Sequence, residues 1–246
     1  VKACTWGDLL LTVTLRIRPY EIHNGDTNRL YDQWQQRLYR DIVSNNRKNT
    51  KLKKVIDEIV DDFDQIPIDE TIRKPKVGVV GEILVKFHPD ANNNIIDVIE
   101  HGGGEAVMPG LADFMLYCLY NANFKRDNLG TKSTSAMLCN LGIWAIESYR
   151  KHMAKVLSEH PKFSSRVPKH IRDIAHGAER VLQLGHSTGE GWFLTGEMIE
   201  LIERGVPNIA CVQPFACLPN HVTGKGMIKE LRRQFPLANI VAVDYD

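Results

Sequence analysis

Residues 208–246, NIACVQPFACLPNHVTGKGMIKELRRQFPLANIVAVDYD, decide the fold of this chain. The stretch opens and closes with short apolar runs, at 208–212 and 239–243, and an amphipathic segment at 221–234 lies between them. Short continuous apolar runs bounded by turn residues are typical of buried parallel strands. The segment therefore predicts a strand, a helix and a second parallel strand, which is the repeating unit of an open α/β sheet.

Cys217 lies between Pro214 and Pro219, where the first predicted strand gives way to the helix. Open parallel sheets bind ligands at this place, outside the carboxyl ends of their strands. A thiol that faces helix-terminal N–H groups is biased toward thiolate, the form that attacks electrophiles or binds a metal. Cys217 is therefore the first candidate for chemistry in the sequence.

The composition is that of an ordinary globular protein of 246 residues and 27.9 kDa. With 43% hydrophobic residues, 25% charged residues and a net charge of +1, nothing indicates a nucleic-acid or membrane partner. The longest uncharged run in the helical middle, Ser133 to Ile146, is too short to span a hydrocarbon layer of about 30 Å. No transmembrane segment is expected.

Five cysteines are present, an odd number, with no CxxC pair and no signal peptide before them. This pattern is untypical of a disulfide framework, so a reducing cytoplasm is the expected location. The chain begins at Val1 without Met and stops at Asp246 directly after a predicted strand, whereas a doubly wound sheet normally continues from such a strand. We therefore expect this chain to be part of something longer.

The N-terminal residues 1–75 are predicted to form a helical lobe. Helical patterns run from Thr5 to about Gln65 and are followed by a linker at 67–75. Four-residue spacing marks the apolar face of the second helix at Leu30, Trp34, Leu38 and Ile42.

From residue 76 the chain reads as α/β. The run 76–87, KVGVVGEILVKF, is rich in β-branched residues and predicts a buried strand. A helix at 93–101 and a short strand at 106–108 complete one βαβ unit. Residues 111–184 are helical and exceed any simple crossover, so part of them is expected to form an inserted cap or interface.

The predicted fold class is therefore α/β, a Rossmann-like open parallel sheet with a helical N-terminal lobe and a helical insertion. The sheet domain covers 76–246 and the insertion covers about 111–184. A further helix at 190–204 leads into the C-terminal strand, helix and strand.

The loop GHSTGEGWFLTGE, at 185–197, is a candidate for binding an anionic cofactor. Its glycines let backbone N–H groups approach an anion at the start of the following helix. The candidate contacts are Gly189, Glu190, Gly191 and Trp192. The competing interpretation is a capping box, because Ser187 and Glu190 have the required spacing, and the loop matches neither GxxxxGK[ST] nor GxGxxG.

A second candidate loop is VGVVGEILVKFHPDANNN, at 77–94. Gly78 and Gly81 allow a close backbone approach at the carboxyl end of the predicted strand. The side chains expected to line a crevice there are Glu82, Lys86, His88 and Asn92. The competing interpretation is ordinary turn and N-cap chemistry in PDANNN.

Three interpretations of Cys217 stay open at this point: a metal or cluster ligand, a nucleophile with His221 as base through the CxxxH spacing, and a small packing residue. A cluster usually takes four protein ligands. The other cysteines are not expected to supply them, because Cys118 and Cys139 fall on apolar helix faces and Cys211 falls within a strand, where core packing is expected.

Several segments also resemble a known family. They are 77–110, 185–233, 239–246 and RIRPYE at 16–21, and PFACLPNH at 214–221 is the most specific motif. On these residues the chain resembles the 2-hydroxyacyl-CoA dehydratases and their CoA-enzyme activases. It is most similar to the carboxyl-terminal part of the very long activase-type members.

The resemblance implies a Rossmann-like fold and an oxygen-sensitive [4Fe-4S] cluster held by cysteines from several segments. Of those positions this chain offers Cys217, and the other ligands are expected upstream of Val1. The resemblance also implies partners, namely other domains or subunits of the activase and dehydratase system. In that system of anaerobic metabolism, an ATP-hydrolysing activator passes one electron to the dehydratase, a lyase that acts on a 2-hydroxyacyl-CoA through a ketyl radical.

The leading hypothesis is thus a fragment of an iron–sulfur subunit or domain that serves ATP-driven electron transfer and radical dehydration. No ATPase motif is found in these 246 residues, so that activity is not assigned to them. The alternative is a non-catalytic α/β docking or regulatory module of a long activase-type chain. The Cys217/His221 thiol enzyme is the third hypothesis.

Overall fold

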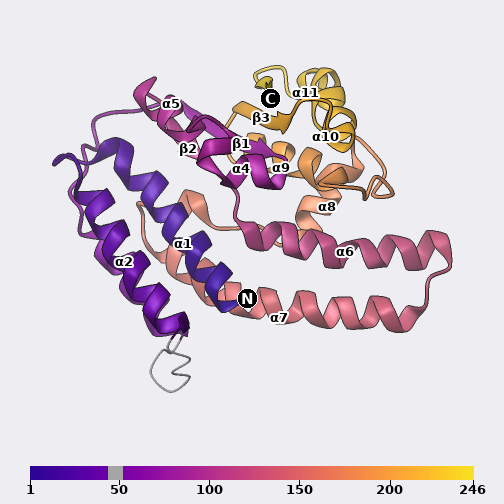
Figure 1. The fold of residues 1–246 in the computed structure, drawn as a ribbon, viewed down its shortest axis with the longest axis horizontal. Coiled ribbons are helices and arrows are strands. Elements are labelled where there is room, and N and C mark those ends of the chain that lie inside the picture. Colours follow the sequence, from indigo (N-terminus) through magenta and orange to yellow (C-terminus); the bar gives the residue numbers. More distant parts are fainter. Residues whose placement is uncertain (44–51) are drawn as a thin grey trace. The chain divides into compact units, whose positions relative to one another are not determined.

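The computed structural model describes residues 1–43 and 52–246 and contains an open sheet of four parallel strands (Figure 1). The strand order is β2-β1-β3-β4. The strands are β1 (Lys76–Gly81), β2 (Glu105–Val107), β3 (Asn208–Pro214) and β4 (Asn239–Tyr245). The predicted α/β class with an open parallel sheet is confirmed.

The strand order places a topological switch point between β1 and β3. The chain passes from β1 to β2 on one side of β1, whereas β3 pairs with the other side of β1 and β4 lies beyond β3. The β1–β3 register runs from Val77 opposite Asn208 to Gly81 opposite Val212. Ligands of open α/β sheets bind where the strand order reverses in this way, so the carboxyl ends of β1 and β3 are the expected site.

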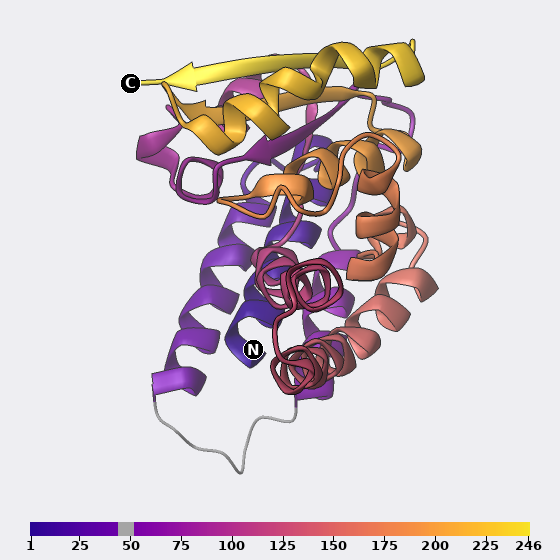
Figure 2. The same ribbon diagram turned by 90° about the vertical axis from the view of Figure 1, so that its right-hand side faces the viewer.

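Helices cover the sheet on both faces. Neighbouring residues of a strand point to opposite faces. Val80 accordingly packs with α9 (Gly191–Glu203) and α11 (Ile228–Gln234), and Val79 packs with α4 (Ile83–Phe87) and α5 (Ile95–His101). Figure 2 shows α11 and β4, both yellow, side by side. Burial on both faces explains why β1 and β3 read as continuous apolar runs, whereas β4, at the edge of the sheet, exposes Val241 by 52%.

The predicted strand at 76–87 is too long. β1 ends at Gly81, where φ is +147° and a Cβ atom would lie 1.8 Å from the carbonyl oxygen of Val212. Glu82 then becomes the N-cap of α4, because its carboxylate accepts a hydrogen bond from the Val85 N–H at 2.8 Å. A close approach to β3 and a capping carboxylate thus convert the strand-like run ILVKF into a helix.

The predicted helix at 221–234 is interrupted. It divides into α10 (Leu218–Thr223), the 3-10 turn η4 (Lys225–Met227) and α11, with Gly224 at the break. A Cβ atom at Gly224 would lie 2.6 Å from the Asn220 oxygen and 3.0 Å from Cys211 Sγ. The chain therefore passes close over β3 at a position that only glycine fits.

The predicted insertion contains three helices: α6 (Leu111–Leu129), α7 (Ser133–Glu159) and α8 (Ile171–Glu179), with η3 (Ser164–Arg166) before α8. Tyr117 of α6 packs on Trp192 and Phe193 of α9, with ring centroids 5.1 Å and 5.3 Å apart. In the described residues no helix has the length and apolar character needed to cross a membrane.

The chain divides into two compact units. Unit 2 comprises Pro75–Pro109, Asp113–Ile143 and Lys169–Asp246, and it contains the sheet. Unit 1 comprises Val1–Lys74, Gly110–Ala112 and Trp144–Pro168. It contains α1 (Lys2–Ile17), η1 (Arg18–Tyr20), α2 (Asp26–Val43) and α3 (Leu52–Asp64). Residues 44–51, part of the predicted helical stretch, lie outside the described residues.

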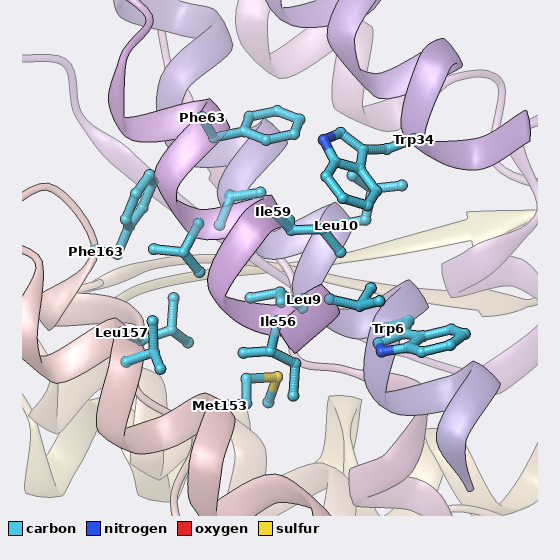
Figure 3. Close-up of a cluster of buried hydrophobic side chains, with 14 of the residues drawn as sticks. Trp6, Leu9, Leu10, Trp34, Ile56, Ile59, Phe63, Met153, Leu157 and Phe163 are labelled. Atoms are coloured by element: carbon cyan, nitrogen blue, oxygen red, sulfur yellow. The ribbon is translucent and has the colours of Figure 1, made fainter. Parts of the chain in front are cut away.

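Unit 1 has its own hydrophobic core (Figure 3). Trp6 and Leu9 of α1 pack with Ile56 and Phe63 of α3 and with Leu157 of α7, and all five side chains are buried. Of the four apolar residues that mark the second helix, Trp34 and Leu38 are buried and Ile42 is about half exposed at 49%. The four-residue spacing therefore marks the core-facing side over the first three turns of α2.

Candidate functional site

The candidate site lies in unit 2, at the carboxyl ends of β1 and β3. Glu82 follows β1 directly, and Cys217 follows β3 after two further residues. The two strands are hydrogen-bonded neighbours, so the loops that leave them start side by side. This is the switch point of the sheet.

Cys217 is the N-cap residue of α10 and is half-buried. Its N–H donates to the Pro214 oxygen at 3.1 Å, and its carbonyl accepts from the His221 N–H at 2.9 Å. The preceding Ala216 has a left-handed backbone with φ of +61°. The Cys217 side chain makes no capping hydrogen bond. The predicted position of Cys217, in the loop between a parallel strand and the next helix, is confirmed.

A buried clamp joins this loop to the loop after β1. The neighbours of Asn220 assign its amide orientation: the nitrogen donates to Glu190 Oε2 at 2.6 Å, and the oxygen accepts from the Glu82 N–H at 2.8 Å. Glu190 Oε1 accepts from the Ile83 N–H at 3.0 Å. Asn220 and Glu190 are 0% and 5% exposed, so these hydrogen bonds fix the start of α10 firmly against α4.

The clamp contains the buried carboxylate of Glu190. Burial raises the pKa of Glu190, the hydrogen bond from Ile83 opposes that rise, and the negative charge of Glu82 adds to it. The predicted capping box is wrong, because the N-cap residue of α9 is Glu190 itself and its side chain binds Ile83 and Asn220. Ser187 lies three residues before that N-cap.

A buried ion pair lies beside the clamp. Lys86 Nζ donates to Glu197 Oε1 at 2.8 Å, and the two side chains are 2% and 3% exposed. Burial raises the pKa of Glu197, and the adjacent Lys86 ammonium opposes the rise. Lys86 was expected to line a crevice, but the structure buries it between α4 and α9, where removal of either partner would leave an unpaired charge.

Of the other predicted contacts, Asn92 and Trp192 form hydrogen bonds within the protein. Asn92 is buried, its nitrogen donates to the Val85 oxygen at 2.7 Å, and its Oδ1 accepts from the Ile95 N–H at 3.1 Å. Trp192 is fully buried, and its indole donates to Asn121 Oδ1 at 2.7 Å. His88 is exposed between α4 and the 3-10 turn η2 (Pro89–Ala91).

The two glycines of the 185–197 loop allow close packing. Gly189 and Gly191 have φ values of +59° and +49°. The Gly189 carbonyl accepts a hydrogen bond from the Tyr117 hydroxyl at 2.8 Å. A Cβ atom at Gly191 would lie 2.1 Å from the His186 oxygen. The close backbone approach expected of these glycines is therefore made to the protein itself.

A second polar cluster, which the sequence did not single out, lies at the carboxyl ends of β3 and β4. Asp244 Oδ1 accepts from Gln213 at 2.7 Å, Asp244 Oδ2 accepts from Lys225 at 2.9 Å, and His221 Nε2 lies 3.3 Å from Oδ1. The hydrogen bonds from Gln213 and Lys225 lower the pKa of Asp244 to about 2. The signal in the sequence was an acidic residue directly after the predicted strand 239–243.

The five cysteines occupy different environments. Cys211 is buried, as expected, and burial together with the charge of Glu197 raises the pKa of its thiol to about 12. Cys118 was expected in the core but is exposed, because α6 turns its neighbours Leu116 and Tyr117 inward instead. Cys4 and Cys139 are half-buried.

These thiols do not form a complete cluster site. In the described ranges, no group of three or more His, Cys, Asp and Glu side chains could hold a metal ion. A [4Fe-4S] cluster takes four protein ligands. The residues placed here supply Cys217 as one candidate ligand, which does not fit a cluster held by this chain alone.

Fold and site together define an α/β protein with an open parallel sheet, and with a buried clamp and a half-buried cysteine at its switch point. Comparisons of the chain with protein-family models, with curated proteins and with solved structures found no match.

Proposed function

We propose that this chain is a domain of an iron–sulfur system related to the 2-hydroxyacyl-CoA dehydratases and their activases. Cys217 contributes one thiolate to a [4Fe-4S] cluster, and other domains or subunits contribute the remaining ligands. Such a system acts on an acyl-CoA thioester in the cytoplasm. The observation that supports the proposal is the position of Cys217, half-buried at the N-cap of α10 and next to the switch point of the sheet.

The surroundings of Cys217 suit a ligand that must keep its position. Asn220, three residues later, is hydrogen-bonded to Glu190 and to the Glu82 N–H. These bonds hold the first turn of α10 against the loop that follows β1. What the chain contributes is thus the placement and access of one ligand, because the described residues do not complete the site.

The proposal is tested in the complete assembly by replacing Cys217 with Ser. We expect the dithionite-reduced protein to lose or change its cluster signal in electron paramagnetic resonance, with a matching loss of iron and acid-labile sulfide. Cys118→Ser is the matched control, because Cys118 is an exposed thiol on α6. A full and unchanged cluster in Cys217→Ser would refute the role of this residue.

The second candidate is a non-catalytic docking or regulatory module. The observation that favours it is that Lys86, Asn92 and Trp192 are all engaged within the protein. The test above separates the two candidates, since a docking module keeps the same cluster content after Cys217→Ser.

The thiol-enzyme hypothesis has one supporting observation. His221 Nε2 lies 3.3 Å from Asp244, and a base oriented by a carboxylate is the arrangement that thiol enzymes use. It predicts fast, selective labelling of Cys217 by thiol reagents at neutral pH, and slower labelling after Asp244→Asn.

A further inference from the structure

The first half of α7 is apolar on two sides. One side packs on α6: Ala136 and Ile143 are buried, and Asn140 exchanges hydrogen bonds with Asn123 of α6 at 2.8 Å and 3.2 Å. Figure 1 shows α6 beside the first half of α7. The contact is close, because a Cβ atom at Gly142 would lie 3.1 Å from Leu119.

The opposite side of α7 carries a row of exposed apolar side chains, which we call the α7 row. Its members are Met137, Leu138, Leu141 and Trp144, exposed by 72%, 69%, 58% and 67%. All four lie on one continuous helix, so their shared face follows from helix geometry alone. The spacing of three and four residues from Met137 through Leu141 to Trp144 is that of a seam between paired helices.

The sequence around the α7 row contains no charge. From Ser133 to Ile146 there is no Asp, Glu, Lys or Arg. A helix that is apolar on all sides is normally buried, whereas a solvent-facing helix carries charges on its outer side. The outer side of α7 therefore has the composition of an interior surface.

We infer that the α7 row is a contact between two copies of this chain. An uncharged apolar row fits another uncharged apolar row, and a second copy offers an identical one. A two-fold axis across the row brings the two helices together antiparallel, in the symmetry that is commonest among homo-oligomers.

The exposed surface of the α7 row supports a second copy of the chain as its binding partner. Each of the four side chains is more than half exposed, and an aromatic side chain such as Trp144 can bury about 150–250 Å². A standard interface buries about 800 Å² per partner, including a polar rim. The α7 row thus supplies the apolar centre of such an interface, with Trp144 as the type of residue that contributes most to binding. The inference does not involve Cys217 and is independent of the proposed function.

The test is sedimentation velocity of the 246-residue chain over a range of protein concentrations. We expect the wild type to sediment as a dimer, at twice the chain mass of 27.9 kDa. Leu141→Lys places a charge in the middle of the row, and we expect the dissociation constant to rise by at least about 100-fold, giving a monomer. Met137→Lys should act in the same direction.

The matched control is Leu237→Lys, the same change at a side chain that is 91% exposed and lies between α11 and β4. This variant should remain a dimer. Far-UV circular dichroism checks that both variants keep the helical content of the wild type. A wild type that is monomeric at high micromolar concentration, or a folded Leu141→Lys that dimerises as well as Leu237→Lys, would overturn the inference.

Discussion

Two carboxylates near the carboxyl ends of the strands, Glu190 and Asp244, lie in opposite environments. Glu190 is buried in the clamp, and burial raises its pKa. Asp244 lies partly exposed near the carboxyl end of β4, where Gln213 and Lys225 donate to it and lower its pKa to about 2. Burial therefore disfavours the charged form of Glu190, whereas hydrogen bonds from Gln213 and Lys225 favour the charged form of Asp244.

Asp244→Asn is expected to make stability less dependent on pH in acid. The folded-state pKa, about 2, lies below the ordinary value of 3.8. The ionised carboxylate therefore adds stability above about pH 4, and this contribution is lost as the pH falls from about 4 toward 2. Urea unfolding midpoints, measured between about pH 5 and about pH 2.5, should fall more steeply for the wild type than for Asp244→Asn.

Asp90→Asn is the control, because it changes an exposed carboxyl on η2. Its midpoints should follow those of the wild type. Equal slopes for the wild type and Asp244→Asn would contradict the assigned role of the Gln213 and Lys225 hydrogen bonds.

At the residue scale, the sequence could place Cys217 because its position depends on a local pattern: an apolar run, two prolines and a helix. It could not reveal the partners of Glu190 or the Lys86–Glu197 pair. That pair joins residues 111 positions apart, and no local pattern encodes such a contact. Cys118 was misassigned for a related reason, since an apolar helix face does not tell which residues at its margin turn outward.

At the element scale, the continuous apolar runs predicted the strands, and burial on both faces explains these runs for β1 and β3. The errors lie where a glycine passes close to another strand. ILVKF has the composition of a strand, but Gly81 and the capping Glu82 start α4 there. The predicted helix at 221–234 is likewise divided at Gly224, where a Cβ atom would lie 3.0 Å from Cys211 Sγ of β3.

Gly81→Ala should be among the most destabilising single changes in unit 2. Its φ of +147° disfavours any side chain, and the new Cβ would meet the Val212 backbone at 1.8 Å. We expect a loss of more than about 3 kcal/mol in the free energy of unfolding, or failure to fold. Urea denaturation followed by circular dichroism gives the measurement.

Gly103→Ala separates the two causes. Gly103 also has a positive φ, +83°, but nothing lies within 4 Å of a Cβ atom there. Its cost should be about 1 kcal/mol, from the left-handed backbone alone. If both variants lose the same amount, the close approach between β1 and β3 does not determine where the strand ends.

At the scale of the whole molecule, the two compact units contain separate cores, and the candidate site belongs to the unit with the sheet. Unit 1 is built from stretches that lie far apart in the sequence, since Trp144–Pro168 packs with the first 74 residues. Helical periodicity predicted the elements of this unit. Helical periodicity could not predict that the C-terminal half of α7 belongs to the core of unit 1. This packing depends on contacts between residues about a hundred positions apart, such as His152 with Asp57.

The isolated 246-residue chain should remain without a stoichiometric cluster after anaerobic reconstitution with iron and sulfide. A [4Fe-4S] cluster needs four ligands, and the described residues place no such group together. Cys211 is not expected to contribute, because its side chain is fully buried in the core that packs against the sheet. Iron and acid-labile sulfide are assayed after desalting, in the wild type and in Cys217→Ser and Cys118→Ser.

We expect the same low content in all three proteins. About four irons per chain in the wild type, lost in Cys118→Ser, would show instead that the exposed thiol of α6 is a ligand and that the site is assembled within this chain. Low content in the isolated chain together with a Cys217-dependent signal in the complete assembly is the combination that the proposed function requires. In that case the cluster is completed only when another part of the assembly covers the loop between β3 and α10.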